Sequence, residues 1–222
     1  MPDFSSYLKS VQQHYSKLQG FYTPTDAVLP LKVQSVEKVD RTSREEGNDR
    51  QSSQKIEQFL VLDGLRKYSL GDDREHVLLA GRPGSGKSMA LQQLAVALAK
   101  EGQIPVLVQL KGNVPILKAI ADELENGDLE FDEKEIKRLL RQQQLILLLD
   151  GINETKDDLR ETLQPFRERY RTTPMIFTTR DLAIGGDLGI GKRFEMKPLS
   201  PEQLREFVGK YLPGQGNGFW DS

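Results

Sequence analysis

The sequence contains no cysteine, and this absence removes several kinds of chemistry at once. Without a thiol the chain forms no disulfide, has no thiolate nucleophile and offers no cysteine ligand for zinc. Its only two histidines, His14 and His76, lie far apart in the sequence, which argues against a histidine-rich metal site. Because a chain without cysteine fits a reducing compartment, we expect a cytoplasmic protein.

Long hydrophobic runs and an excess of one charge are also missing. No apolar stretch approaches the ~20 residues that span a bilayer, and the N-terminus lacks a basic segment followed by an apolar core. We therefore expect no membrane partner. The 31 Lys and Arg nearly balance the 33 Asp and Glu, which gives no electrostatic reason to expect nucleic acid. Lys134, Lys137, Arg138 and Arg141 stand among acidic residues at helical spacing, which favours a solvated helix surface over a nucleic-acid face.

The chain is long enough to form one domain with a complete hydrophobic core. Its 222 residues exceed a small domain but fall short of two domains of ordinary size. We expect residues 1–39 to form a small N-terminal helical and extended segment. Residues 40–55 carry no hydrophobic side chain and are expected to be a flexible linker. The main domain is expected at 56–212, followed by a flexible tail at 213–222.

Apolar runs alternate with amphipathic stretches along the main domain. The apolar runs predict strands at 76–80, 104–110, 145–149, 175–178 and 194–196, after a short strand within 29–39. The amphipathic stretches predict helices at 56–68, 87–100, 116–124, 132–142, 156–170 and 200–212, after an N-terminal helix with Phe4, Leu8, Val11 and Tyr15 on one face. This alternation indicates an α/β fold, a three-layer sandwich with a parallel sheet flanked by helices.

One glycine-rich segment carries the strongest functional signal. It matches the pattern G-x-x-x-x-G-K-[ST] and lies between an apolar strand and a helix, the context that this motif requires. The glycines let successive backbone N–H groups turn toward phosphate oxygens, and the helix dipole adds positive potential. We expect Lys87 to contact the β- and γ-phosphates and Ser88 to bind Mg²⁺. The residues expected to hold ATP or ADP are Gly81, Arg82, Pro83, Gly84, Ser85, Gly86, Lys87 and Ser88.

A carboxylate follows the next fully apolar strand in the manner of a Walker B motif. Asp150 comes directly after residues 145–149 and is expected to hold Mg²⁺, directly or through water; the alternative is a plain turn residue. Gly151 stands where AAA-type ATPases usually place a glutamate. Glu154 is therefore our candidate for positioning or activating the attacking water, against the alternative of an acid that stabilises a helix start.

Polar residues also end the strand predicted at 175–178. Arg180 is a candidate to sense the γ-phosphate, with Thr179 assisting. The alternative is that Arg180 pairs with Asp181 or with another surface acid. The sequence thus proposes Glu154, Arg180 and Thr179 as catalytic groups.

The segments GRPGSGKS, LILLLDGINE and PMIFTTRD, in this order and spacing, resemble the NACHT family of signal-transduction NTPases, particularly its bacterial members. The likeness covers most of the chain. The NACHT family is part of the STAND class of NTPases. The resemblance implies an ATP-dependent switch, in which ATP promotes an open state that self-associates and ADP holds the closed state. The sequence contains no LSGGQ segment, which argues against a transporter ATPase, and no N-K-x-D segment, which argues against a guanine-specific GTPase. Adenine is therefore expected, partly by elimination and partly from the resemblance.

Two departures from that pattern are visible. Asn153 stands where family members commonly carry an acid next to the acid matching Glu154, which argues for slow hydrolysis or for none. The resemblance also implies that the chain is truncated after the nucleotide-binding domain, so that sensor and effector regions are absent. Two functions follow as alternatives: a slow ATPase switch in signalling or defence, and a nucleotide-binding module that does not turn over.

Overall fold

A computed structural model of the chain describes residues 2–19, 32–36, 58–72, 74–126, 129–154, 157–180 and 188–196. The linker predicted at 40–55, the helix predicted at 200–212 and the tail at 213–222 lie outside the described residues. No helix in the described part of the chain is both long and apolar enough to cross a bilayer.

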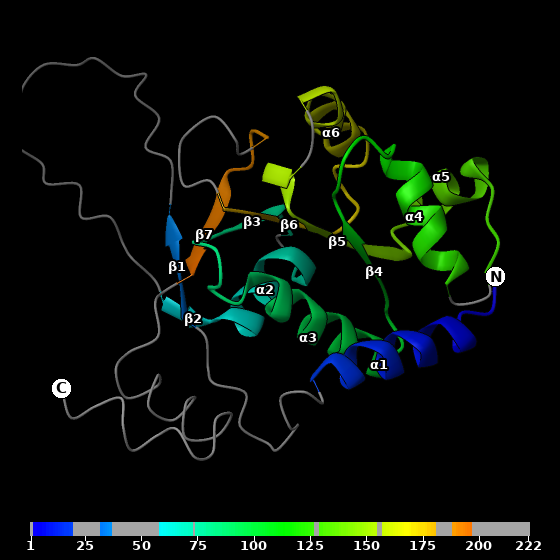
Figure 1. The fold of residues 1–222 in the computed structure, drawn as a ribbon, viewed down its shortest axis with the longest axis horizontal. Helices are drawn as coiled ribbons and strands as arrows, with labels where there is room; N and C mark the ends of the chain where they lie inside the picture. Colours follow the sequence, from blue (N-terminus) through cyan, green and yellow to red (C-terminus); the bar gives the residue numbers. More distant parts are fainter. Residues whose placement is uncertain are drawn as a thin grey trace, which may run out of the picture.

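Seven strands form one sheet, at the centre of Figure 1. They are β1 (Lys32–Val36), β2 (Gln58–Leu60), β3 (Val77–Ala80), β4 (Ile104–Gln109), β5 (Leu145–Asp150), β6 (Met175–Thr179) and β7 (Lys192–Met196). Their order across the sheet is β2-β1-β7-β3-β6-β5-β4. The strands β7, β3, β6, β5 and β4 are parallel, whereas β1 runs antiparallel to both β7 and β2. The predicted parallel sheet is therefore confirmed, with an antiparallel pair added at one edge.

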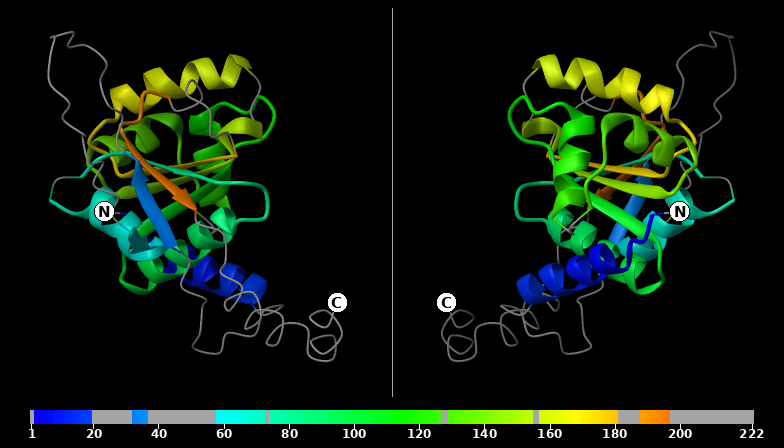
Figure 2. Two further views of the ribbon diagram at one scale, coloured as in Figure 1. Left: turned by 90° about the vertical axis from the view of Figure 1, so that its left-hand side faces the viewer. Right: turned by 90° about the vertical axis from the view of Figure 1, so that its right-hand side faces the viewer.

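Helices cover the sheet on both faces. They are α1 (Ser5–Gln19), α2 (Val61–Leu70), α3 (Lys87–Lys100), α4 (Ile116–Glu125), α5 (Glu133–Arg141) and α6 (Asp157–Arg169), with a short 3-10 turn, η1, at Ile152–Glu154. Figure 2 shows α6 along one face of the sheet and α3 on the other, with α1 beyond α3. The Asp132 side chain and Glu135 cap α5 reciprocally, as the capping box in the sequence predicts.

The helix predicted at 56–68 is wrong at its start. Residues 58–60 form β2, which pairs with β1, and the helix begins only at Val61. A short apolar run is compatible with either structure, and here pairing with a neighbouring strand decides it. The strand expected within 29–39 is β1, and it belongs to the main sheet because it pairs with β7.

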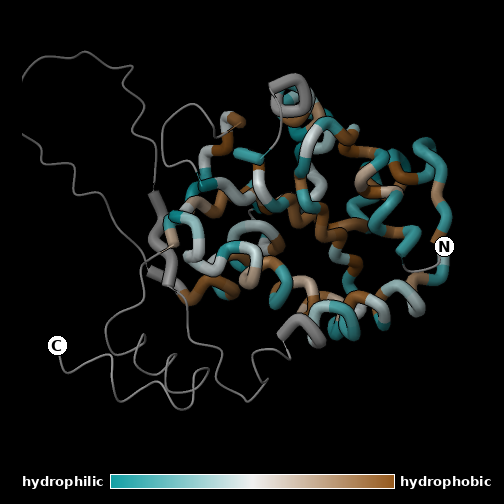
Figure 3. Tube along the Cα trace, in the orientation of Figure 1, coloured by the Kyte–Doolittle hydropathy of each residue, from teal (hydrophilic) through white to brown (hydrophobic). Residues whose placement is uncertain are grey.

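The core lies between the central strands and their covering helices. Every residue of β3 and β6 is buried, and so are the apolar residues of β5. Figure 3 shows apolar residues concentrated along these central strands, with polar residues on the outer helices. Buried strands in the middle of a sheet are rigid supports, so they hold whatever follows their carboxyl ends in fixed relative positions.

Candidate functional site

The strand order brings three predicted site segments to one edge of the sheet. Strand β6 lies between β3 and β5 and is parallel to both. In this register Ala80 pairs with Thr179, so the phosphate loop after β3 lies beside the end of β6. Asp150 ends β5 on the other side of β6. The carboxyl ends of parallel strands are where open α/β sheets bind ligands.

The phosphate loop is held at its first residue. The Gly81 N–H donates to the Thr179 carbonyl oxygen at 3.2 Å, which continues the sheet pairing into the loop. A Cβ on Gly81 would lie 2.8 Å from the Ser85 hydroxyl oxygen and 2.9 Å from the Met196 Cβ. Gly86 has a φ of 90°, in the left-handed region that favours glycine, and α3 begins directly after it. The loop conformation therefore depends on glycine at both ends.

Lys87 is buried and turned back onto the loop that precedes it. Its ammonium donates to the carbonyl oxygens of Gly81 at 2.7 Å and Arg82 at 3.1 Å. Burial lowers the pKa of Lys87, and the Asp150 carboxylate is the largest influence in the opposite direction. Arg180 and Glu154 also influence this pKa, so the charged groups that the sequence singled out lie within electrostatic reach of one ammonium.

A buried threonine ties Asp150 in place. The Thr178 hydroxyl donates to the Asp150 Oδ1 and accepts the Gly151 N–H at 2.9 Å. Gly151 has a φ of 92°, which explains why a glycine follows the acidic residue here. The turn that it starts leads directly into η1 and Glu154, whose N–H donates to the Gly151 carbonyl oxygen at 2.9 Å.

Arg180 makes two contacts with that turn. Its guanidinium Nη2 lies 2.5 Å from the Glu154 Oε1, and its backbone N–H donates to the Asn153 Oδ1 at 2.8 Å. The Arg180 side chain is 52% exposed and that of Glu154 is 36% exposed. The sequence alternative that Arg180 pairs with a surface acid thus describes its position here, and the acid is Glu154. Asp181, the other acid that the sequence offered, lies outside the described residues.

The donor set suits Mg²⁺ held jointly with a nucleotide. Within the described ranges no group of three or more His, Asp or Glu side chains gathers as a metal site. Magnesium usually takes one or two protein oxygens and completes its shell with water and phosphate. One exposed hydroxyl, Ser88, and one half-buried carboxylate, Asp150, would supply those oxygens.

Sequence reasoning missed two residues in this arrangement. The sequence places Thr178 in a strand and gives it no role, although a buried hydroxyl in a central strand needs a hydrogen-bond partner, which is a usable signal. Asn153 stands out in the sequence only as a missing acid, yet its Oδ1 accepts the Arg180 N–H. Thr179 is buried, and its carbonyl oxygen holds Gly81.

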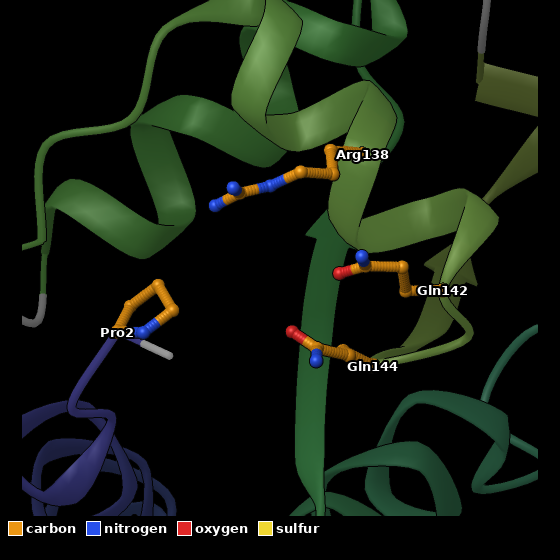
Figure 4. Close-up of a pocket in the computed structure, with 4 residues that line it drawn as sticks. All are labelled: Pro2, Arg138, Gln142 and Gln144. Carbon is orange, nitrogen blue, oxygen red and sulfur yellow. The ribbon is translucent and has the colours of Figure 1, made fainter.

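A separate hollow lies at the opposite end of the sheet. It has a volume of about 450 Å³ and is lined by Pro2, Arg138, Gln142 and Gln144. Figure 4 shows the three polar side chains projecting from α5 and from the segment just before β5. Because Gln144 precedes β5 and Asp150 ends it, this hollow is separate from the phosphate loop.

Comparisons with known proteins place the fold in a wider setting. Residues 52–212 match the NB-ARC domain family. A comparison with curated protein sequences found no match.

A DNA replication initiation factor is similar in structure, with 17% identity and a TM-score of 0.46 over 68% of this chain and 48% of that one. The Thermotoga maritima RuvB Holliday junction branch migration motor shows 17% identity and a TM-score of 0.39 over 68% of this chain and 48% of that one. C. elegans PCH-2 shows 14% identity and a TM-score of 0.39 over 67% of this chain and 42% of that one. The chain spans about half the length of these solved structures.

Proposed function

This chain belongs to the NB-ARC domain family, a STAND-class P-loop NTPase module, and from that premise we propose that it binds ATP or ADP with Mg²⁺ on the loop Gly81 to Ser88. We propose further that the bound nucleotide acts as a switch and that any hydrolysis is slow. The observation that carries the proposal is the position of Lys87. Its buried ammonium is satisfied by loop carbonyls, and the charges of Asp150, Arg180 and Glu154 all influence its pKa.

The phosphates would take the place of weaker contacts in this loop. A buried ammonium bonded to carbonyl oxygens gains a stronger partner when a phosphate oxygen arrives, because the phosphate carries a full negative charge whereas a carbonyl oxygen carries only a partial one. The backbone N–H groups of the loop and the start of α3 add a positive electrostatic potential. Lys87 would then hold the β- and γ-phosphates as a point charge.

Each remaining polar group has a proposed task around those phosphates. Mg²⁺ supplies charge neutralisation when it is bound, and Ser88 with Asp150 would hold it. Glu154 would orient the attacking water by accepting its hydrogen bond. Arg180 would leave Glu154 to contact the γ-phosphate, where a guanidinium stabilises developing negative charge, and the buried Thr179 would assist by keeping this strand end in register.

The alternative is a module that binds nucleotide without turnover. Two observations favour it: Asn153 is an amide rather than an acid, and Glu154 is already paired with Arg180. Asn153→Asp separates the two alternatives, because an aspartate keeps the acceptor for the Arg180 N–H and restores the second carboxylate. Phosphate release by the wild type that rises in this variant supports the slow ATPase, whereas no release by the wild type supports the binding module.

Isothermal titration of the purified chain with ATP, ADP and GTP, each with and without Mg²⁺, tests the proposal as a whole. We expect ATP and ADP to bind, and to bind more tightly with Mg²⁺. Equal affinity for GTP would contradict the preference for adenine. Absence of binding to all three nucleotides would contradict the function itself.

The narrower assignments from the sequence are proposals of the same kind. We propose a NACHT-type switch within the STAND class, a cytoplasmic role in signalling or defence, and self-association in the ATP state. Light scattering of the chain with ADP and with a non-hydrolysable ATP analogue checks the last of these. A larger mass with the analogue is the expected result, and an unchanged mass would count against ATP-driven assembly.

A further inference from the structure

We infer that Thr178 is a positioning residue for Mg²⁺ binding, acting through Asp150. This inference rests on the proposed function, because it assigns to Thr178 control over the metal dependence of the same site. Thr178 is not part of the motif around Lys87, and its hydroxyl contacts Asp150 and Gly151. It acts on the carboxylate.

The direction of the hydrogen bonds follows from the chemistry of a hydroxyl. A threonine hydroxyl has one proton to donate and two lone pairs that accept. The Gly151 N–H donates to the Thr178 Oγ1 at 2.9 Å, so one lone pair is occupied and the hydroxyl proton is free to point elsewhere. It points to the Asp150 Oδ1. The Asp150 Oδ1 therefore accepts a hydrogen bond from a fixed donor, and a carboxylate held in this way is a suitable metal ligand.

Burial makes this pair of bonds persistent. Thr178 is 1% exposed, so water does not compete for its hydroxyl. Asp150 is at the last position of β5 and is half-buried. At such a position a carboxylate without a fixed hydrogen-bond partner can rotate toward solvent. One bond to Oδ1 fixes the rotation and leaves Oδ2 available to the metal or to its bound water. Ligating carboxylates in metal sites are generally held by such outer hydrogen bonds.

The same hydroxyl also fixes the start of the turn that carries Glu154. Gly151 is held by its N–H to Thr178, and its carbonyl oxygen accepts the Glu154 N–H at 2.9 Å. Strand β6 therefore sets the positions of the metal carboxylate and, through one turn, of the candidate water-positioning carboxylate. Both depend on one side chain in the strand between β3 and β5.

Thr178→Val tests the inference, because valine keeps the branched shape and removes only the hydroxyl. Titration of the full chain with ADP over a range of free Mg²⁺ gives the Mg²⁺ concentration for the half-maximal gain in ADP affinity. We expect this concentration to rise about 10–100-fold, the usual effect of removing an outer-shell partner. ADP affinity in EDTA should stay at the wild-type value. Thr178→Ser, which keeps the hydroxyl, should keep the wild-type Mg²⁺ dependence.

Thr173→Val is the matched control. Thr173 is also a buried threonine next to β6, and its hydroxyl donates to the Leu140 carbonyl oxygen at 2.7 Å, before the other end of the strand. Losing that bond should destabilise the fold without changing the Mg²⁺ dependence. A change of Mg²⁺ dependence in Thr173→Val as large as in Thr178→Val would overturn the inference, because the effect would then be a general loss of stability.

A double-mutant cycle with Asp150→Asn completes the test. If Thr178 acts through Asp150, adding Thr178→Val to Asp150→Asn should have no further effect on the Mg²⁺ dependence. Additive effects would overturn the inference. Loss of Mg²⁺ dependence in Thr178→Ser would also overturn it, and the serine variant keeps the test informative if Thr178→Val does not fold. Failure of the wild-type chain to bind ADP is a distinct result, which contradicts the proposed function and removes the inference with it.

Discussion

The guanidinium of Arg180 lies 2.5 Å from the carboxylate of Glu154, so the candidate phosphate sensor and the candidate water-positioning acid are paired with each other. Both side chains are substantially exposed, and exposed ion pairs are worth about 0–1 kcal/mol. A bound γ-phosphate carries more charge than one carboxylate and would compete for the guanidinium at little cost. The ion pair is therefore easily broken. Under the proposed function, Arg180 would contact the γ-phosphate when ATP is bound and Glu154 when ADP is bound.

Glu154→Gln should lower ATP turnover while leaving nucleotide affinity unchanged. The wild-type rate is expected to be on the order of 10⁻² s⁻¹ or below, as for P-loop switches with incomplete charge stabilisation. Losing a group that orients water should reduce it by on the order of 10²-fold. Phosphate release at saturating ATP measures the rate, and Glu125→Gln, an exposed acid at the end of α4, serves as the control. An unchanged rate in Glu154→Gln would remove Glu154 from the mechanism.

Lys87→Ala should abolish most of the stabilisation that nucleotide gives to the fold. A ligand at 100 times its dissociation constant stabilises by about 2.7 kcal/mol, and a phosphate loop without its lysine loses the main cation that holds the ligand. Thermal unfolding with and without Mg²⁺-ADP measures the gain. Lys100→Ala lies at the exposed end of the same helix and should keep the full gain. Equal gains in wild type and Lys87→Ala would refute the assignment of the loop.

Gly81→Ala should destabilise the protein by about 1–3 kcal/mol, the usual range for overpacking. Its new Cβ would come within 2.9 Å of the Met196 Cβ, and neither atom is at the end of a flexible side chain. Gly191→Ala is the control, since nothing lies within 4 Å of its Cβ and its φ is not in the left-handed region. That variant should be neutral or more stable by about 0.4–1 kcal/mol. Urea unfolding of both variants checks the contrast.

Stability should fall as pH is lowered from about 6.5 to 4 because of His76. Burial lowers the pKa of His76 from its ordinary 6.5 to about 4. Between those values the unfolded chain binds a proton that the folded chain does not, so acid favours unfolding. The contribution is fully present above pH 6.5 and is on the order of 3 kcal/mol at 1.36 kcal/mol per pH unit. Urea unfolding at pH 7 and pH 5 should show a loss of about 2 kcal/mol, the part of this contribution that lies between pH 6.5 and 5.

His76→Gln should lose this pH dependence. The side chain is buried, with Nε2 3.0 Å from the Thr173 carbonyl oxygen, and a glutamine amide can keep a donor there without a protonation change. His14→Gln replaces the exposed histidine of α1 and should retain the wild-type profile. If His76→Gln and wild type lose equal stability between pH 7 and pH 5, another group is responsible.

Local sequence signals were sufficient for the parts of the fold that are set by local chemistry. The alternation of apolar runs located the central strands, and the Asp132–Glu135 capping box located the start of α5. The phosphate loop was identifiable because its backbone geometry demands glycine at fixed spacing. In each of these cases the residues within one segment are sufficient to determine the local structure of that segment.

Pairing between distant segments could not be obtained in this way. Nothing within residues 29–39 indicates that β1 pairs with β7, whose sequence lies some 160 positions later. The partnership of Thr178 with Asp150 depends on strand order, which places β6 between β3 and β5. The pairing of Arg180 with Glu154 depends on the turn that Gly151 starts.

The position of β7 has a consequence for synthesis of the chain on the ribosome. This strand joins the parallel part of the sheet to β1, since it pairs with β3 on one side and with β1 on the other. A nascent chain that has not yet delivered residues 192–196 leaves β3 with an open edge and β1 without its inner partner. Open strand edges are sites of aggregation, and pairing across a long sequence separation is slow. The amino-terminal strand must therefore wait for nearly the whole domain to emerge, and chaperone dependence should concentrate in that interval.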